Sequence, residues 1–486
     1  MSRSLSHEVG ILTLGRVFTY AVMFLVPLVN VRTLSVEEYG YYRQFWLLFE
    51  TLTPMAILGF SRSLLYYLPR VETRGEKSAY ITQTVLFLAL GSVVAMGIYA
   101  VMAIWFGEGL GATARAFFWR LCFFTLFMVV TDYLEVLFVA QRRPVAQSAY
   151  HVTAWGLQAI VVMAVSYLTR DVSAIIWAIT LLGLARFVFG ILYTNSNYGL
   201  SLHAVSRGSL REQASFAVPV GLAGIGVIMI TQTDKFLINR FMGREAFAIY
   251  SVGAFQVPLA NIIQSSISNV TFPLMAKYQK AGQYAELIGL WQRSLMKAVV
   301  LFFPIFVFLE VTARPFITIL FTEQYADATP VFMIYLLLFL RGSIEAGAII
   351  QVFNRTVFSV VAFFVGFVVD VILGILLYKT MGRLGVPLAA LLTLTTLSAA
   401  SLWFSAKLLG TSLLKLVPAW PLTKRFLVAA APGVILSLLY QRWPVTNVYQ
   451  MGAAGLLYSG LYAGLCAWTR LVTVDDLKAL VGRTSI

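Results

Sequence analysis

The chain has 486 residues, of which 59% are hydrophobic and 12% are charged, and its mean hydropathy is +0.82. A soluble domain carries roughly 25% charged residues, so this composition excludes an ordinary soluble enzyme and predicts a polytopic membrane protein. The formal net charge of +15 comes from basic residues scattered over short loops. That distribution fits membrane topology better than a nucleic-acid-binding face, so we expect an all-α membrane protein that binds no nucleic acid.

Apolar runs long enough to span a hydrocarbon core of about 30 Å recur along the whole chain. The first run, "ILTLGRVFTYAVMFLVPLVNV", lacks a small-residue cleavage site, so we interpret it as a retained first helix. The loops between the runs are too short for a soluble catalytic domain. We expect about fourteen spanning helices, at approximately 11–31, 41–66, 80–104, 113–140, 146–168, 173–193, 214–239, 245–273, 291–312, 328–351, 356–378, 384–408, 424–440 and 449–469.

The basic residues in the loops predict the orientation. With the N-terminus placed in the cytoplasm, the cytoplasmic loops hold about twice as many Lys and Arg residues as the outer loops. We therefore expect a multi-pass protein of the inner (cytoplasmic) membrane with both termini on the cytoplasmic side.

Three pairs of short segments indicate an internal duplication. The segment "RTLSVEEYGYY" resembles "RFMGREAFAIY", "WFGEGLGATARAFF" resembles "LFTEQYADATPVFM", and "AQRRPVA" resembles "VFNRTVF". All three pairs keep their order with an offset of roughly 210 residues, which predicts two repeats of six spans. Because six is even, an axis along the membrane normal relates the repeats. We expect an N-terminal lobe at 1–199, a cytoplasmic linker at 200–213, a C-terminal lobe at 214–410, and two extra helices with a cytoplasmic tail at 411–486.

Arginines within the predicted spans are the first candidate site residues. An ionisable residue there costs roughly 2.5–3.5 kcal/mol, so each one needs an explanation. Arg16 and Arg62 lie in the cytoplasmic halves of adjacent spans, and Arg186 and Arg341 lie at similar depth. A guanidinium donates two parallel hydrogen bonds to an oxyanion, so clustered arginines favour a phosphate or pyrophosphate ligand. The alternative is pairing with acids, for example Arg341 with Glu345 one turn further along.

Three acids within the spans are candidates for ion coupling. Asp132 and Glu135 lie one turn apart, and Asp370 stands alone near the middle of another span. Carboxylates in such positions relay protons or hold a cation in transporters. Asp132 and Glu135 could equally accept hydrogen bonds from nearby arginines, namely Arg142, Arg143 or Arg186.

The span 245–273 carries a stripe of amides and hydroxyls. The residues at i, i+3 and i+4 spacing are Asn261, Gln264, Ser265, Ser268 and Asn269. Such a stripe either joins helices by hydrogen bonds or lines a hydrated path. Its length favours the path, and because amides and hydroxyls bind sugars, we predict that Asn261 and Gln264 contact substrate.

An acid and a base stand side by side in "MITQTDKFLINRF". Asp234 and Lys235 are predicted near the outer end of their helix, where a charge costs less than at mid-bilayer. Adjacent helical residues point about 100° apart, so the two side chains need not pair. We expect Asp234 to anchor the second lobe or couple an ion, and Lys235 or its neighbours to meet the substrate head group late in transport.

Several stretches carry a family resemblance. The stretches "LSVEEYGYYRQFWLLFETLTPMAILGFSRSLLYYLPR", "QTDKFLINRFMGREAFAIYSVGAF" and "FTEQYADATPVFMIYLL" resemble regions of polysaccharide flippases. These flippases belong to the multidrug/oligosaccharidyl-lipid/polysaccharide (MOP) exporter superfamily. The resemblance covers essentially the whole chain.

The resemblance implies two six-helix lobes around a central cavity, with two extra helices at the C-terminus. It implies alternating-access transport of an undecaprenyl-pyrophosphate oligosaccharide to the outer leaflet. Arg16, Arg62, Asp234 and Lys235 then lie on cavity-lining helices. Because the eighth span is uncharged, an O-antigen, capsule or exopolysaccharide unit is favoured over lipid II. The expected partners are this lipid-linked oligosaccharide, membrane lipids, a polysaccharide polymerase and glycosyltransferases.

Two other functions stay open on the sequence alone. A multidrug and toxin extrusion antiporter of the same fold prefers about twelve helices and an acidic cavity. A membrane glycosyltransferase or polymerase usually needs acids near a large outer loop, whereas the loops here are short. The sequence contains no P-loop and no HExxH motif. We therefore expect a transporter, not an enzyme, with no cofactor or metal.

Overall fold

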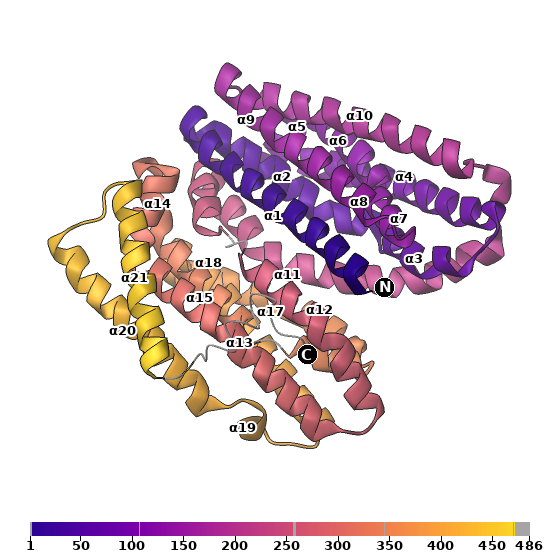
Figure 1. Cartoon of the computed structure of the whole chain (residues 1–486). Helices are drawn as coiled ribbons and strands as arrows, with labels where there is room; N and C mark the ends of the chain where they lie inside the picture. The colour runs from indigo at the N-terminus through magenta and orange to yellow at the C-terminus, as the bar shows by residue number, and fades with distance from the viewer. Residues whose placement is uncertain (1, 106, 256–258, 345, 470, 472–486) are drawn as a thin grey trace. The chain divides into compact units, whose positions relative to one another are not determined.

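The computed structural model describes residues 2–105, 107–255, 259–344, 346–469 and 471. Every regular element among these described residues is a helix, which confirms the predicted all-α class. The first eleven α-helices are α1 Ser2–Thr33, α2 Val36–Ile57, α3 Phe60–Tyr67, α4 Arg74–Trp105, α5 Ala112–Ala116, α6 Phe118–Thr131, α7 Tyr133–Ala140, α8 Pro144–His151, α9 Leu157–Thr169, α10 Val172–Tyr198 and α11 Arg207–Gly253 (Figure 1).

The second half of the chain contributes ten more α-helices. They are α12 Leu259–Lys280, α13 Tyr284–Val311, α14 Ala313–Phe321, α15 Thr329–Gly342, α16 Gly347–Val352, α17 Thr356–Met381, α18 Gly385–Leu408, α19 Leu413–Leu416, α20 Ala419–Arg442 and α21 Val448–Trp468. Short 3-10 and π-helical turns connect several of them.

Many of these helices are suited to a membrane. Within the described residues, nine helical stretches are long and apolar enough to cross one. Two of them, 207–253 and 356–408, have 47 and 53 residues, more than twice the roughly 20 residues that one crossing needs. None of the nine lies in α1, α2, α12 or α21, where four further spans were predicted, so the count of about fourteen stays a prediction. Outward-facing side chains such as Ile104, Leu168 and Leu456 are more than three-quarters exposed, as lipid-facing residues are.

The helices form two compact units. The first contains residues Met1–Ser251 and Phe363–Ile375, and the second contains Val252–Ala362 and Leu376–Ile486. These units follow contacts between residues, whereas the predicted lobes follow the duplication, so the predicted lobe boundaries remain a prediction. In the first unit α6 packs on α4 and α10, and α1 packs on α8 and α9. In the second, α13 packs on α12, α15 and α20.

The predicted span 41–66 is divided where it meets α11. Its two parts, α2 and α3, are separated at Leu58 and Gly59, which both have left-handed backbone angles (φ 40° and 77°). A Cβ on Gly59 would lie 2.3 Å from the Ala217 carbonyl oxygen, and one on Gly221 would lie 2.4 Å from the Leu58 carbonyl carbon. The two backbones therefore touch directly, and this close approach requires glycine on both sides.

The predicted spans 113–140 and 146–168 are also interrupted. Asp132 separates α6 from α7, and its N–H donates to the Val129 carbonyl three residues back. Between α8 and α9 the chain makes a π-helical turn at Val152–Gly156. Such turns are rare in helices and concentrate at functional sites.

The start of α2 is fastened to the chain beyond the kink at Gly243 (φ 80°) in α11. The Arg244 guanidinium lies 2.7 Å from the Glu37 carboxylate, and its carbon lies 3.4 Å above the centre of the Tyr41 ring. A Cβ on Gly40 would come within 2.6 Å of the Arg244 side chain. The similar sequence segments 32–42 and 240–250 therefore contact each other within the first unit.

Candidate functional site

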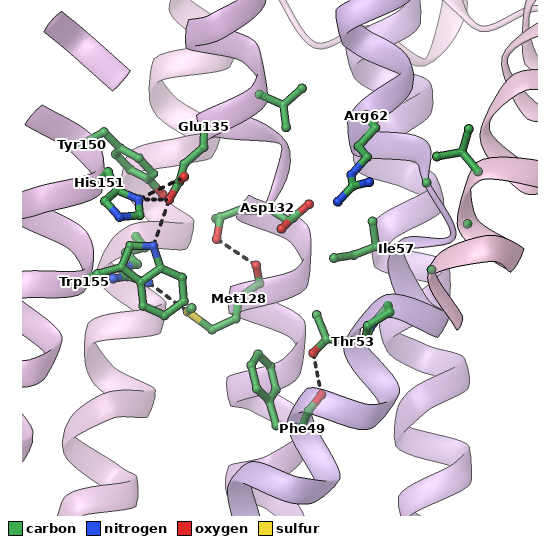
Figure 2. Close-up of a pocket in the computed structure, with 18 of the residues that line it drawn as sticks. Phe49, Thr53, Ile57, Arg62, Met128, Asp132, Glu135, Tyr150, His151 and Trp155 are labelled. Atoms are coloured by element: carbon green, nitrogen blue, oxygen red, sulfur yellow. Dashed lines mark hydrogen bonds and ion pairs between the residues drawn. The ribbon is translucent and has the colours of Figure 1, made fainter. Parts of the chain in front are cut away.

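The first unit contains a cavity of about 630 Å³ among its helices (Figure 2). This volume falls within the roughly 300–1,000 Å³ that is typical of ligand sites. Its lining residues come from α1, α2, α3, α6, α7, α8, the π-helical turn, α10 and α11. They are Tyr20, Met23, Phe49, Thr53, Pro54, Ile57, Gly59, Arg62, Met128, Thr131, Asp132, Glu135, Val136, Tyr150, His151, Trp155, Arg186, Val220, Gly221 and Gly224.

Glu135 is held from two sides on one wall of the cavity. The Nδ1 atom of His151 lies 3.1 and 3.2 Å from the two carboxylate oxygens, and the Trp155 Nε1–H donates to Oε1 at 2.9 Å (Figure 2). The alternative donors Arg142, Arg143 and Arg186, named from the sequence, make none of these bonds. The reason is geometric, because the turn between α8 and α9 brings His151 and Trp155 to the same carboxylate.

Arg186 supports the same wall. Its guanidinium carbon lies 4.9 Å from the centre of the Trp155 ring, and its Nη1 atom lies 3.3 Å from the Met128 sulfur. A guanidinium over an indole face makes a cation–π contact, which also fixes the ring. Trp155 is therefore held both by its N–H and by its ring face.

Arg62 and Asp132 face each other across the cavity. Figure 2 shows the two charged groups pointing toward one another from α3 and from the junction of α6 and α7. Both side chains are exposed, although both lie within the bundle of the first unit. None of the ion pairs found among the described residues includes either of them. Their carboxylate and guanidinium groups therefore remain accessible to a ligand.

Helix interruptions place these two charges. Arg62 follows the Gly59 break by three residues, and Asp132 itself forms the break between α6 and α7. Of the other arginines that we predicted to cluster, Arg186 lines the same cavity. Arg341 lies in the second unit and donates to the Ser398 hydroxyl at 2.5 Å. The side chain of Arg16 and residue Glu345 lie outside the described part of the chain.

Asp234 and Lys235 have separate partners, although they are adjacent. Asp234 is 2% exposed and accepts a hydrogen bond from the Tyr250 hydroxyl. The Lys235 amine donates to the Thr231 carbonyl at 3.0 Å and to the Gln232 side chain at 2.6 Å. Asp234 thus joins the part of α11 before the kink at Gly243 to the part after it. The Lys235 side chain extends back along its own helix.

The predicted polar stripe contributes to the second unit. Gln264 donates to the Gly342 carbonyl at 2.9 Å. Together with Ser268, it lines a cavity of about 60 Å³ that contains no charged side chain. The side chain of Asn261 lies outside the described part of the chain. Asp370 is 1% exposed on α17, within the segment that belongs to the first unit.

His151 and Trp155 are the site residues that sequence reasoning missed. Glu135 and His151 are separated by 16 positions and lie on different predicted spans. No helical spacing joins them, so helical periodicity does not predict their contact. A lone histidine in a span that follows a pair of acids was the one available hint.

Comparisons with known proteins agree with this architecture. The family described as "Polysaccharide biosynthesis protein" matches residues 29–330. No curated protein matches the chain. Among solved structures, the chain is similar to a lipid II flippase MurJ in an inward closed conformation. The TM-score is 0.71 at 13% identity, and the match covers 94% of this chain and 98% of the other.

Two further solved structures share the fold. A multidrug resistance MATE family transporter of the MOP superfamily, in an inward-facing conformation, matches with a TM-score of 0.61 at 12% identity. That match covers 80% of this chain and 94% of the other. A MOP superfamily transporter from Pyrococcus furiosus matches with a TM-score of 0.58 at 12% identity, over 83% and 95% of the chains. At these identities the likeness concerns the fold.

Proposed function

Because the chain belongs to the polysaccharide biosynthesis protein family and has the fold of MOP superfamily transporters, we propose that it flips a lipid-linked oligosaccharide across the membrane. The carrier is an undecaprenyl-pyrophosphate type lipid. The glycan is a unit for O-antigen, capsule or exopolysaccharide synthesis. Transport proceeds by alternating access from the cytoplasmic to the outer leaflet.

One observation carries the proposal. A cavity of about 630 Å³ lies within a bundle of apolar helices, and its lining includes the exposed charges Arg62 and Asp132. Charged groups inside the membrane are retained where they meet a polar substrate, ion or water. A membrane protein of a polysaccharide pathway has such a substrate in the hydrophilic head of a glycolipid.

The predicted basic residues contact different parts of the substrate head group. The Asp132 carboxylate opposite Arg62 disfavours a phosphate there, because like charges repel. We therefore assign the phosphates to the other two predicted cations, Arg16 and Lys235. The amides Asn261 and Gln264 contact the glycan, and Asp234 keeps α11 in place through Tyr250.

The energy source is an ion gradient in this proposal. Glu135 with His151, and Asp370 in α17, are the coupling groups, since carboxylates within spans bind and release protons or cations. Asp132 was predicted together with them, but its position opposite a guanidinium favours contact with the substrate. The protein acts in the inner (cytoplasmic) membrane with both termini inside. It receives its substrate from glycosyltransferases and supplies a polysaccharide polymerase.

A flipping assay tests the proposed function. Purified protein in proteoliposomes is given a fluorescent lipid-linked oligosaccharide, and an added lectin reports how much of it reaches the accessible leaflet. We expect the protein to equilibrate the lipid between leaflets within minutes, whereas protein-free vesicles do so over many hours. Vesicles that export a cationic dye under a sodium or proton gradient, without moving the glycolipid, would instead show a multidrug antiporter.

A further inference from the structure

The space between Arg62 and Asp132 is the feature that the proposed function leaves unexplained. An arginine and a carboxylate on facing helices usually close into a bidentate pair, which is a strong charge-assisted contact. Here both side chains are exposed and form no ion pair with each other. Figure 2 shows them directed at one another across the cavity.

The backbone around both groups is fixed. Arg62 follows the break at Gly59, whose neighbours on α11 leave no room for a Cβ. Asp132 sits in a turn in which its own N–H bonds Val129 instead of Met128. Two interrupted helices therefore set the separation of the charges, and a ligand of suitable size can be held between them without a rearrangement of the helices.

The charges of the described lining of the cavity nearly cancel. Among the side chains that the structure describes, the lining holds two guanidiniums and two carboxylates, with one histidine that adds a charge when protonated, namely Arg62, Arg186, Asp132, Glu135 and His151. A cavity with balanced charge does not concentrate a polyanion such as a diphosphate. It suits a neutral ligand that makes many hydrogen bonds.

Hydroxyl groups of a ligand can form hydrogen bonds with both Arg62 and Asp132. A hydroxyl both donates and accepts, whereas a guanidinium only donates and an ionised carboxylate only accepts. One hydroxyl of a diol can donate to Asp132 while its neighbour accepts from Arg62, so a sugar satisfies both charges at once. Aromatic side chains complete the lining, among them Tyr20, which is 41% exposed, and Trp155, which is fixed by Glu135 and Arg186.

We propose that this cavity binds one neutral sugar residue of the glycan, with Asp132 accepting from one hydroxyl and Arg62 donating to the next. The proposal rests on the proposed function, since it names the part of the glycolipid that occupies the cavity. Arg186 acts as a positioning residue that holds the wall around Trp155, and Glu135 and His151 do so in addition to their proposed coupling role.

Ligand-observed NMR on the full-length protein in nanodiscs tests the proposal. The probes are methyl α-glucopyranoside, methyl α-galactopyranoside, sodium pyrophosphate and sodium chloride. We expect saturation transfer to at least one glycoside, and binding weakened about tenfold or more in Arg62→Gln and in Asp132→Asn, as for the loss of a charged hydrogen bond. The double variant should bind more weakly than either single variant, because each group bonds a different hydroxyl of the same ligand.

Matched variants separate binding from folding. Arg314→Gln and Glu323→Gln remove the same charges from an exposed pair in the second unit and should leave glycoside binding unchanged. Arg62→Lys and Asp132→Glu keep the charge but move it, and they should also weaken binding while the melting temperature is unchanged. Equal glycoside binding by wild type and the Arg62 and Asp132 variants would overturn the proposal, as would the absence of binding to the wild type.

The ionic probes give the competing outcomes. Pyrophosphate binding that is lost in Arg62→Gln and strengthened in Asp132→Asn would make this a phosphate site and overturn the proposal. Sodium binding that is lost in Asp132→Asn, without glycoside binding, would make this cavity a cation site and would also overturn the proposal. A protein that flips the glycolipid but binds no glycoside here would refute this inference alone. Glycoside binding without flipping would refute the proposed function.

Discussion

The two units contain very different cavities. The first unit has a cavity of about 630 Å³ lined by arginines, acids and a histidine. In the second unit one cavity of about 60 Å³ is lined by Gln264, hydroxyls and apolar groups, and another of about 280 Å³ is lined mainly by apolar side chains. The alignment that pairs Arg143 with Arg355 places Ile344 opposite Asp132 and Gly347 opposite Glu135. Among the described residues, neither of these cavities of the second unit has a charged side chain in its lining, so the charged lining belongs to the cavity of the first unit.

The largest expected difference is in the free energy of unfolding, when a glycine that lines the 630 Å³ cavity and one that lines the 60 Å³ cavity are each replaced by alanine. Gly59→Ala places a Cβ 2.3 Å from the Ala217 carbonyl oxygen at a residue with a φ of 77°. Overpacking costs roughly 1–3 kcal/mol and a left-handed alanine another 1–2, so the free energy of unfolding should fall by about 2–5 kcal/mol. Denaturant unfolding in detergent measures it.

Gly342→Ala is the matched change in the second unit, because nothing lies within 4 Å of its Cβ position. Its effect should stay within about 1 kcal/mol, the difference in helix propensity between glycine and alanine. Equal effects of the two substitutions would show that the close backbone approach in the first unit does not constrain the protein.

The next largest effect is expected from reversing a charge in the large cavity. Arg62→Glu sets two carboxylates against each other and removes the donor to the substrate, so flipping should slow about a hundredfold, or roughly 2.7 kcal/mol. The proteoliposome lectin assay measures the rate. Arg314→Glu reverses a charge on an exposed side chain of the second unit and should leave the rate unchanged. A normal rate in Arg62→Glu would remove this residue from the site.

A smaller effect is expected from the wall that supports Trp155. Glu135→Ala leaves the Trp155 N–H and His151 without their acceptor, which costs about 1–3 kcal/mol of stability. The melting temperature should fall and flipping should slow several-fold. Glu135→Gln keeps an acceptor for the indole N–H and should restore most of the stability. If Glu135→Ala and Glu135→Gln were equally stable, these hydrogen bonds would not fix the wall.

The smallest effect is expected in the second unit. Ser268→Ala removes a hydroxyl from the lining of the small cavity and should change flipping less than twofold, since a single neutral hydrogen bond contributes about 1 kcal/mol. The same lectin assay checks it. A tenfold loss would mean that the polar stripe of α12 contacts the substrate directly and that the two cavities matter equally.

The sequence predicted the helical class well, because long apolar runs and rare charges leave few alternatives. It also identified Arg62, Asp132 and Glu135 as unusual. It did not predict their arrangement, because that depends on backbone breaks. Asp132 interrupts a span without glycine or proline, and the π-helical turn after His151 has no local signature. Contacts such as that of Glu135 with His151 form between different spans, and helical periodicity, which describes the faces of a single helix, does not predict them.

The composition of the first unit also affects how the protein is made. Its residues 363–375 lie in the middle of α17, after the whole stretch 252–362 that belongs to the second unit. At roughly 5–20 residues per second, a ribosome needs about 5–25 s to make that stretch. During this interval the nascent first unit lacks one of its packing partners, and α11 keeps Leu237 uncovered by Gly374. During synthesis, helices of the first unit that are already inserted therefore lack their contacts with residues 363–375 for some seconds. Chains truncated before residue 363 should accordingly be preferred targets for membrane proteases.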